Sequence, residues 1–250
     1  MSLLMVEQLV KHFGGLAAAD GLDINVEAGE IHAVIGPNGA GKTTLVNQLS
    51  GEIRPDAGRI VFDGQEITRT PAYRRSLLGL SRSYQITSVL PDFTALQNVA
   101  MAVQARAGHS FAFWSPAGTD RALTDPAREA LAQVGLADRA DALAANLAHG
   151  EQRQLELAVA LASRPKLLLL DEPMAGMSYG EAEGIVSLLA SLRGRYSILL
   201  VEHDMDAVFA LADRITVLVY GRPIACGTPD EIRGNPDVRD AYLGDQDAEE

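Results

Sequence analysis

The eight residues at positions 36–43 limit what this chain can fold into more than any other stretch. They read GPNGAGKT and fit the pattern G-x-x-x-x-G-K-[ST] without a mismatch. Glycines let the backbone turn tightly, so that its N–H groups face one point. The apolar run 31–35 before them predicts a buried strand, and the run 45–49 after them predicts a helix whose start adds further free N–H groups. This order of strand, turn and helix predicts a loop that cradles phosphate groups.

Two side chains of this loop have expected chemical tasks. Lys42 supplies a mobile cation for the β- and γ-phosphates of a nucleotide, and the Thr43 hydroxyl is placed to ligate Mg²⁺. The alternative is a glycine-rich turn without a ligand, which the strand–loop–helix context disfavours. The predicted phosphate-binding residues are Gly36, Pro37, Asn38, Gly39, Ala40, Gly41, Lys42, Thr43 and Thr44.

A second motif follows a second apolar run. Four leucines at 167–170 lead directly into Asp171, Glu172 and Pro173. Asp171 is expected to hold Mg²⁺ through its water shell, because Mg²⁺ gives up water reluctantly. Side chains alternate along a strand, so Glu172 points elsewhere and can accept a proton from an attacking water. The pair could also be a strand end that caps a helix, but the upstream loop favours a nucleotide-hydrolysing site.

Charge and composition limit the kinds of partner and environment that we expect for this chain. The formal net charge is -12, which argues against a nucleic-acid partner because such proteins favour a basic face. The only cysteine is Cys226, so no intrachain disulfide is expected. No apolar segment approaches the roughly 20 residues that span a bilayer. We therefore expect a soluble chain that depends on another protein if it works at a membrane.

The order of apolar runs predicts an α/β fold. Continuous apolar runs at 167–170, 198–201 and 215–219 are typical of strands covered on both faces, and helical stretches near 179–193 and 204–212 separate them. This alternation predicts a mainly parallel sheet with helices packed on it. The alanine- and leucine-rich stretch at about 88–154 differs in character, and we interpret it as a helical insertion.

Three further features name a family. Leu147-Ala148-His149-Gly150-Glu151 precedes an apolar helix about twenty residues before Asp171, Gln85 lies between the phosphate loop and the insertion, and His203 follows an apolar strand. In this order the motifs resemble the ATP-binding subunit of ABC transporters over nearly the whole chain.

The resemblance implies a P-loop NTPase of the ABC-ATPase fold that binds ATP and Mg²⁺ and hydrolyses ATP. It implies one domain over residues 1–250, with an antiparallel N-terminal β subdomain. The core subdomain is expected at about 1–87 and 155–250, and the helical subdomain at about 88–154.

The resemblance also assigns roles at the matching positions. Phe13 matches the aromatic that stacks on adenine, Gln85 the glutamine that ligates Mg²⁺ and senses the transmembrane partner, and His203 the histidine that contacts the γ-phosphate. Taken singly, Phe13 could be a core residue, Gln85 a surface residue and His203 a residue at a helix start. Lys42, Glu172 and His203 are the expected catalytic residues.

The signature segment Leu147, Ala148, His149, Gly150 and Glu151 departs from the commonest family form, Leu-Ser-Gly-Gly-Gln. In the family this segment meets ATP held by the opposite subunit of a head-to-tail dimer. Ala148 lacks the serine hydroxyl that reaches the γ-phosphate, whereas the Gly150 N–H and the helix start can still serve. Ser178 also stands where an aspartate is common.

These departures resemble the branch that serves branched-chain amino-acid importers and their relatives. The resemblance implies a homodimer or a heterodimer with a paralogue, permease subunits, a periplasmic solute-binding protein, and a place on the inner face of the plasma membrane. Val89, Leu90 and Phe93 are candidates for docking the permease, with core packing as the alternative. A lipopolysaccharide-type exporter and a soluble ABC ATPase stay open as other functions. A GTP-binding switch is disfavoured because the guanine-reading motif Asn-Lys-x-Asp is absent.

Overall fold

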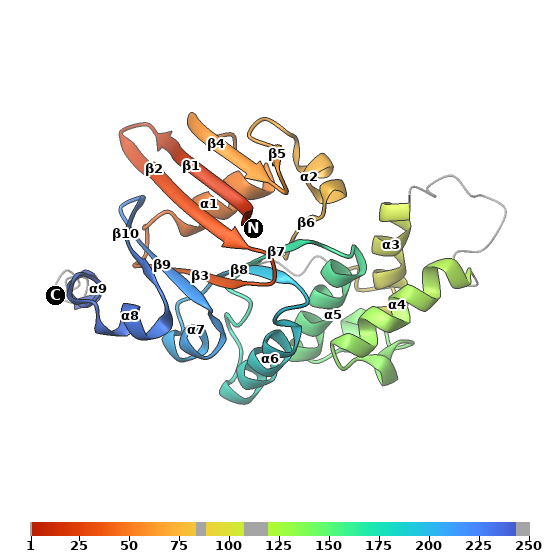
Figure 1. Ribbon diagram of the computed structural model, residues 1–250. Coiled ribbons are helices and arrows are strands. Elements are labelled where there is room, and N and C mark those ends of the chain that lie inside the picture. Colours follow the sequence, from red (N-terminus) through yellow and green to blue (C-terminus); the bar gives the residue numbers. More distant parts are fainter. Residues whose placement is uncertain (1, 84–88, 108–119, 244–250) are drawn as a thin grey trace.

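The computed structural model describes residues 2–83, 89–107 and 120–243. Its strands form two sheets (Figure 1). The first has four strands in the order β2-β1-β4-β5, all antiparallel. Its strands are β1 (Ser2–Phe13), β2 (Leu16–Glu27), β4 (Ala57–Phe62) and β5 (Gln65–Glu66). This is the antiparallel N-terminal sheet that the family resemblance implied.

The second sheet has six strands in the order β10-β9-β3-β8-β7-β6. Every neighbouring pair is parallel except β9 and β10, which form an antiparallel hairpin. The mainly parallel α/β core expected from the sequence is confirmed. Its strands are β3 (Ile31–Ile35), β6 (Leu80–Arg82), β7 (Leu167–Asp171), β8 (Ser197–Val201), β9 (Arg214–Val219) and β10 (Arg222–Gly227).

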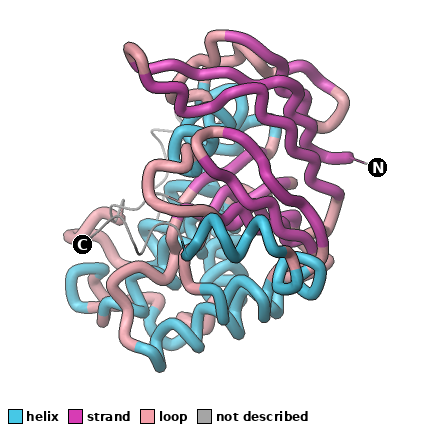
Figure 2. The backbone as a smooth tube through the Cα atoms, turned by 90° about the vertical axis from the view of Figure 1, so that its left-hand side faces the viewer, coloured by secondary structure: helices cyan, strands magenta, loops and turns pink. Residues whose placement is uncertain are grey.

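Helices cover both faces of this sheet, and the strands gather toward the upper half of the molecule in Figure 2. Helices α3 and α4 pack on each other and on α5, within the stretch interpreted as a helical insertion. The boundaries of that insertion stay a prediction. The helices are α1 (Lys42–Ser50), α2 (Ala72–Leu78), α3 (Ala95–Ala107), α4 (Arg121–Gln133), α5 (His149–Ala162), α6 (Tyr179–Leu192), α7 (Met205–Leu211), α8 (Pro229–Gly234) and α9 (Pro236–Leu243), with 3₁₀ turns η2 (Ala137–Arg139) and η3 (Ala144–Asn146).

The leucines of β7 show why the core runs are continuously apolar. Leu167 and Leu169 pack with α1 and the N-terminal sheet, whereas Leu168 and Leu170 pack with α5 and α6 on the opposite face. All four are fully buried, because successive side chains of a strand point to opposite faces and both faces are covered. Helix α1 thereby lies in the core shared by the two sheets.

The strand order positions the functional segments. β3, β8 and β7 are neighbours and run parallel, so their carboxyl ends lie along one edge of the sheet. Ligands of parallel α/β sheets bind at this edge. The phosphate loop follows β3, Asp171 ends β7, and His203 comes two residues after β8. Motifs separated by well over a hundred residues therefore converge.

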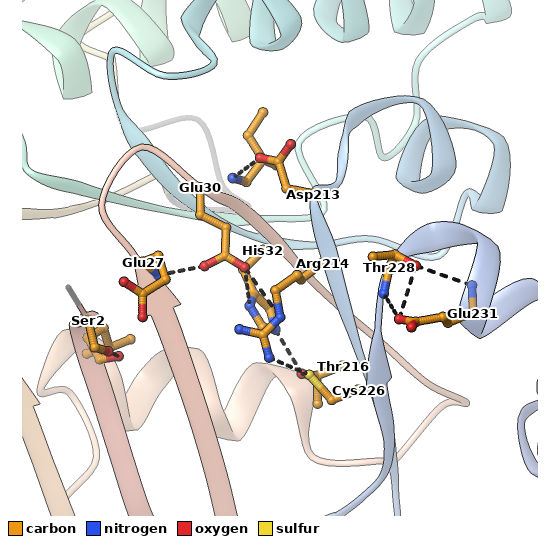
Figure 3. A network of polar contacts seen from close by, with 12 residues as sticks. Ser2, Glu27, Glu30, His32, Asp213, Arg214, Thr216, Cys226, Thr228 and Glu231 are labelled. Atoms are coloured by element: carbon orange, nitrogen blue, oxygen red, sulfur yellow. Dashed lines mark hydrogen bonds and ion pairs between the residues drawn. The ribbon is translucent and has the colours of Figure 1, made fainter.

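A buried network of hydrogen bonds connects β3 to the β9–β10 hairpin (Figure 3). The His32 ring lies between Glu30 and Thr216, with Nδ1 3.2 Å from Glu30 Oε1 and Nε2 2.8 Å from Thr216 Oγ1. Glu30 Oε2 also accepts a hydrogen bond from the Glu27 N–H. Burial alone would raise the pKa of Glu30, but these hydrogen bonds, together with the charges of His32 and Arg214, outweigh it and hold the pKa below its ordinary value of 4.5.

We expect the Glu30→Gln substitution to lower the free energy of unfolding at pH 7 by about 1.5–3 kcal/mol, the usual contribution of hydrogen bonds to a charged group. A depressed pKa contributes stability that is present above 4.5 and is lost as the pH falls through the folded-state value. The difference in the free energy of unfolding between wild type and variant should therefore become smaller in acid, as measured by urea unfolding between pH 7 and pH 3. A difference independent of pH would contradict this account. Glu66→Gln, which removes a surface partner of Arg59, is the control and should change stability by less than about 1 kcal/mol.

Candidate nucleotide-binding and catalytic site

The phosphate loop requires glycine at two positions for steric reasons. Gly36 has φ 151° and a Cβ there would lie 2.1 Å from the carbonyl oxygen of Leu218. Gly41 has φ 101° and a Cβ there would lie 2.1 Å from the carbonyl oxygen of Ala18. β9 and β2 therefore press directly against the loop, so no side chain could be inserted without moving the backbone. The sequence pattern predicted that the loop needs glycine at these positions, but the tight contacts with β9 and β2 appear only in the structure.

Lys42 is the first residue of α1 and folds back over the loop that precedes it. Its Nζ donates to the carbonyl oxygens of Gly36 at 2.6 Å and Pro37 at 3.0 Å. Burial lowers the pKa of Lys42 below its usual range, while the nearby carboxylates of Glu172 and Asp171 act in the opposite direction. The first turn of α1 carries no acidic side chain, so its N–H groups and dipole face the loop without an internal anion. The arrangement suits an anionic ligand.

The two carboxyl oxygens of Asp171 differ in their contacts. Its Oδ2 lies 3.2 Å from Arg82 Nη2, whereas the buried Oδ1 has no hydrogen bond within the described residues. Burial raises the pKa of this carboxyl; Arg82 opposes the shift, and Glu172 adds to it. A buried carboxylate oxygen left without a donor is a suitable ligand for Mg²⁺ or one of its waters. The residues present therefore fit the predicted cation.

Glu172 has an unusual backbone conformation. It has φ 50°, in the left-handed region that residues other than glycine seldom adopt, and its N–H donates to the carbonyl oxygen of Val201 at 2.9 Å. Its side chain is half-buried, whereas that of Asp171 is buried, so the two adjacent carboxyl groups lie in different environments. Such strain costs about 1–3 kcal/mol and gathers at functional sites. It is consistent with a carboxylate that the fold aims at a ligand.

Sequence reasoning missed Glu202, which joins two segments of the site. The buried carboxylate accepts the Met174 N–H at Oε1 and the His203 N–H at Oε2, each at 3.0 Å. Burial raises its pKa, and these backbone donors oppose the shift. Glu202 thus ties the segment after Glu172 to the exposed His203. The available signal was an acidic residue that directly follows the apolar run 198–201.

The structure places Phe13 but not Gln85. Phe13 ends β1 and is 49% exposed, with Lys11 Nζ 5.5 Å from the centre of its ring. A core role for Phe13, the alternative interpretation, is thereby disfavoured, and the ring is open to a planar ligand. Gln85 lies outside the described residues; the strand before it, β6, ends at the same sheet edge as β7.

The signature segment lies at the start of α5. Leu147 is buried, and Ala148 and His149 are exposed. The Gly150 N–H donates to Glu181 Oε1 at 3.2 Å, and Glu151 accepts from Arg139 and from the Ala148 N–H. Within the described residues, no hydrogen bond joins this segment to the phosphate loop of the same chain.

Comparison with known proteins identifies the class. The family model described as ABC transporter matches residues 19–175. The chain belongs to this family, the ATP-binding proteins of ABC transporters, whose members bind ATP. A second model, described as branched-chain amino acid ATP-binding cassette transporter, matches residues 222–248.

Individual relatives refine the assignment. The high-affinity branched-chain amino acid transport ATP-binding protein BraF of Pseudomonas aeruginosa is 39% identical over 250 residues, covering 97% of this chain and 98% of BraF. The corresponding protein LivG of Escherichia coli has the same identity and coverage, 39%, 97% and 98%. The lipopolysaccharide export system ATP-binding protein LptB of Haemophilus influenzae is 31% identical, covering 98% and 99%. The chain is of the branched-chain amino acid transport type, as its sequence predicted.

Solved structures agree with the fold. The ADP conformation of MJ1267, an ATP-binding cassette of an ABC transporter, superposes with a TM-score of 0.86 at 29% identity, over 98% of this chain and 99% of that chain. The dimeric bacterial cassette MJ0796 superposes with a TM-score of 0.76 at 22% identity, over 90% and 98%, and supports the fold alone.

We expect the Lys42→Ala substitution to weaken ATP binding by about 10- to 150-fold, because one buried cation worth about 1.5–3 kcal/mol is lost. Equilibrium dialysis with labelled ATP measures the change. Lys166→Ala is the matched control: Lys166 is exposed and pairs with Asp63 on the surface, so its removal should leave ATP affinity unchanged. Tight ATP binding by the Lys42 variant would refute the assignment of the phosphate loop.

Proposed function

We propose that this chain hydrolyses ATP to power the import of branched-chain amino acids, or related small solutes, through a membrane permease. One observation carries the proposal: Lys42 at the start of α1 and the adjacent pair Asp171 and Glu172 come from two segments far apart in the sequence, yet they interact electrostatically at the edge where β3, β8 and β7 end. A cation, a carboxylate with an oxygen free to hold a metal and a second carboxylate suited to act as a base form the minimal set for phosphoryl transfer to water.

Each of these side chains has one proposed role in ATP hydrolysis. Glu172 accepts the proton of the attacking water, whose oxygen forms the new bond to the γ-phosphorus as the bond to the bridging oxygen of ADP breaks. Lys42 and the loop N–H groups stabilise the negative charge on the phosphates. His203 is held through its N–H by Glu202, and we assign its exposed ring to contact with the γ-phosphate. Phe13 offers its exposed ring to adenine.

Thr43, Asp171 and Gln85 are the residues that would hold Mg²⁺. When bound, the cation neutralises phosphate charge during the displacement. Asp171 contributes the oxygen that has no hydrogen bond within the described residues. The Thr43 side chain, exposed on the first turn of α1, contributes its hydroxyl.

A second ATPase subunit would complete the site. Within the described residues the signature segment 147–151 makes no hydrogen bond to the phosphate loop of the same chain, and its own-chain partners are Arg139 and Glu181, which is compatible with a role toward nucleotide held by another subunit. Glu181 also accepts from the N–H and hydroxyl of Ser178, so the two segments that depart from the common family form are linked. The partner would be an identical copy or a paralogue.

A groove between the core and the insertion is our candidate for docking the permease. It has a volume of about 570 Å³, and Leu77 of α2, Val89, Ala102 of α3 and Val159 of α5 are among the apolar residues that line it. A helix of the permease with an apolar face is the proposed occupant. Leu90 and Phe93 follow Val89 in the chain and are 38% and 39% exposed, whereas Val89 also packs on the core.

Import is favoured over export by the relatives. BraF and LivG are 39% identical to this chain, LptB is 31% identical, and the branched-chain amino acid model matches the C-terminal residues 222–248. Among the described residues we find no helix with the length and apolar character that a bilayer crossing needs. We therefore place the chain at the inner face of the plasma membrane through permease subunits, supplied with solute by a periplasmic binding protein. A lipopolysaccharide-type exporter is the second candidate.

We expect the Glu172→Gln substitution to slow steady-state ATP turnover by about 10²–10⁴-fold while ATP binding persists, because only the base is removed. Phosphate release measures turnover, and sedimentation measures whether ATP still drives subunit pairing. Glu129→Gln, on the exposed side of α4, is the control and should retain turnover. Turnover near the wild-type rate in the Glu172 variant would remove Glu172 from the mechanism.

We expect cells that carry only the Glu172→Gln variant to lose uptake of labelled leucine, isoleucine and valine while glucose uptake continues. The tagged chain should copurify from detergent extracts with a polytopic permease. Normal amino-acid uptake together with failed lipopolysaccharide export would favour the exporter instead.

A further inference from the structure

Arg82 is the last residue of β6, and it has no role in the mechanism proposed above. β6 pairs in parallel with β7, with Arg82 opposite Leu169, so its side chain starts two positions before Asp171 on the neighbouring strand. The side chain is only 8% exposed. A buried guanidinium at the catalytic edge needs a physical reason, because an unpaired buried charge is costly.

The guanidinium joins the Asp171 carboxylate to α1. Nη2 reaches Asp171 Oδ2 at 3.2 Å, while Nη1 donates to Asn47 Oδ1 at 2.5 Å and Ser50 Oγ at 3.3 Å in the later turns of α1. Nη1 also pairs with Glu52 Oε2 at 3.0 Å. Helix α1 begins with Lys42 and Thr43, so one rigid element carries the phosphate-binding end and the anchor of Arg82.

The contact with Arg82 fixes which oxygen of Asp171 is available. Oδ2 is engaged by the guanidinium, which leaves Oδ1, buried and without a hydrogen bond in the described part of the chain, as the oxygen for the cation. Glu52 offsets the charge of Arg82, so electrostatic repulsion of a metal by Arg82 is reduced. Orientation is therefore the dominant effect of the contact.

We propose that Arg82 is a positioning residue for the magnesium ligand Asp171, holding its carboxylate in register with α1 through a planar, multiply anchored guanidinium. The inference rests on the proposed role of Asp171 in binding Mg²⁺. Lysine cannot replace arginine in this role, because a single ammonium lacks the fixed fork that bridges Asp171 to Asn47 and Glu52.

The test measures ATP affinity by equilibrium dialysis, once with Mg²⁺ and once with EDTA, in chains that all carry Glu172→Gln to prevent hydrolysis. The ratio of the two dissociation constants is the gain due to the metal. We expect Arg82→Ala and Arg82→Lys to reduce that gain by about 10- to 100-fold, the usual effect of removing a group that orients a metal ligand. Affinity in EDTA should stay within about twofold of the parent, because the phosphate loop is untouched.

Further variants separate positioning from folding. Asn47→Ala removes one anchor of Arg82 without changing the guanidinium or Asp171, and should reduce the gain in the same direction but less. Arg59→Ala, on the exposed surface of β4, should have no effect. The Asn47 variant keeps the inference testable if the Arg82 variants fail to fold.

Four outcomes would overturn the inference. A full metal gain in Arg82→Lys would mean that charge alone matters, and an equal loss of affinity with and without Mg²⁺ would mean that Arg82 only supports the fold. If Asn47→Ala kept the full gain in ATP affinity due to the metal, the anchoring of Arg82 to α1 would have no effect on metal binding. A parent chain that binds ATP with no metal gain would instead contradict the proposed Mg²⁺ role of Asp171, and the inference would fall with it.

Discussion

The parallel pairing of β3, β8 and β7 is the constraint on which the rest of this structure depends. Each strand is short and buried on both faces, so its register is set by the packing of alternate side chains into two different cores. That register brings the phosphate loop, Asp171 and His203 to one edge. A slip of one residue in β7 would exchange the faces of its leucines and move Asp171 away from Lys42.

The same edge concentrates charges that the fold has to stabilise. Lys42, Asp171, Arg82 and Glu202 are all buried there or nearly so, and each is held by hydrogen bonds or an opposite charge. An incompletely satisfied oxygen remains on Asp171. The site therefore combines rigid support with one unsatisfied ligand position, which is the arrangement expected where a cation and a polyphosphate bind.

Local patterns in the sequence were enough to predict the fold class and the main motifs. The glycines at 36 and 41 and the leucines of β7 carry their information in adjacent residues, so the loop and the buried strand could be recognised directly. The contact of Arg82 with Asp171 and that of Glu202 with Met174 could not, because the two partners lie 89 and 28 residues apart and only the folded sheet brings them together. The roles of Gln85 and of the signature segment depend on residues outside the described chain or on a second subunit, so they stay predictions.

The most direct test of this account is to locate the metal and the γ-phosphate in crystals of the Glu172→Gln chain grown with ATP and Mn²⁺, whose anomalous scattering identifies the ion. The account predicts one Mn²⁺ beside Asp171 Oδ1 and the Thr43 hydroxyl, with the phosphates on Lys42 and on backbone N–H groups of the phosphate loop. A metal held elsewhere, or a nucleotide bound away from the carboxyl ends of β3, β8 and β7, would contradict it.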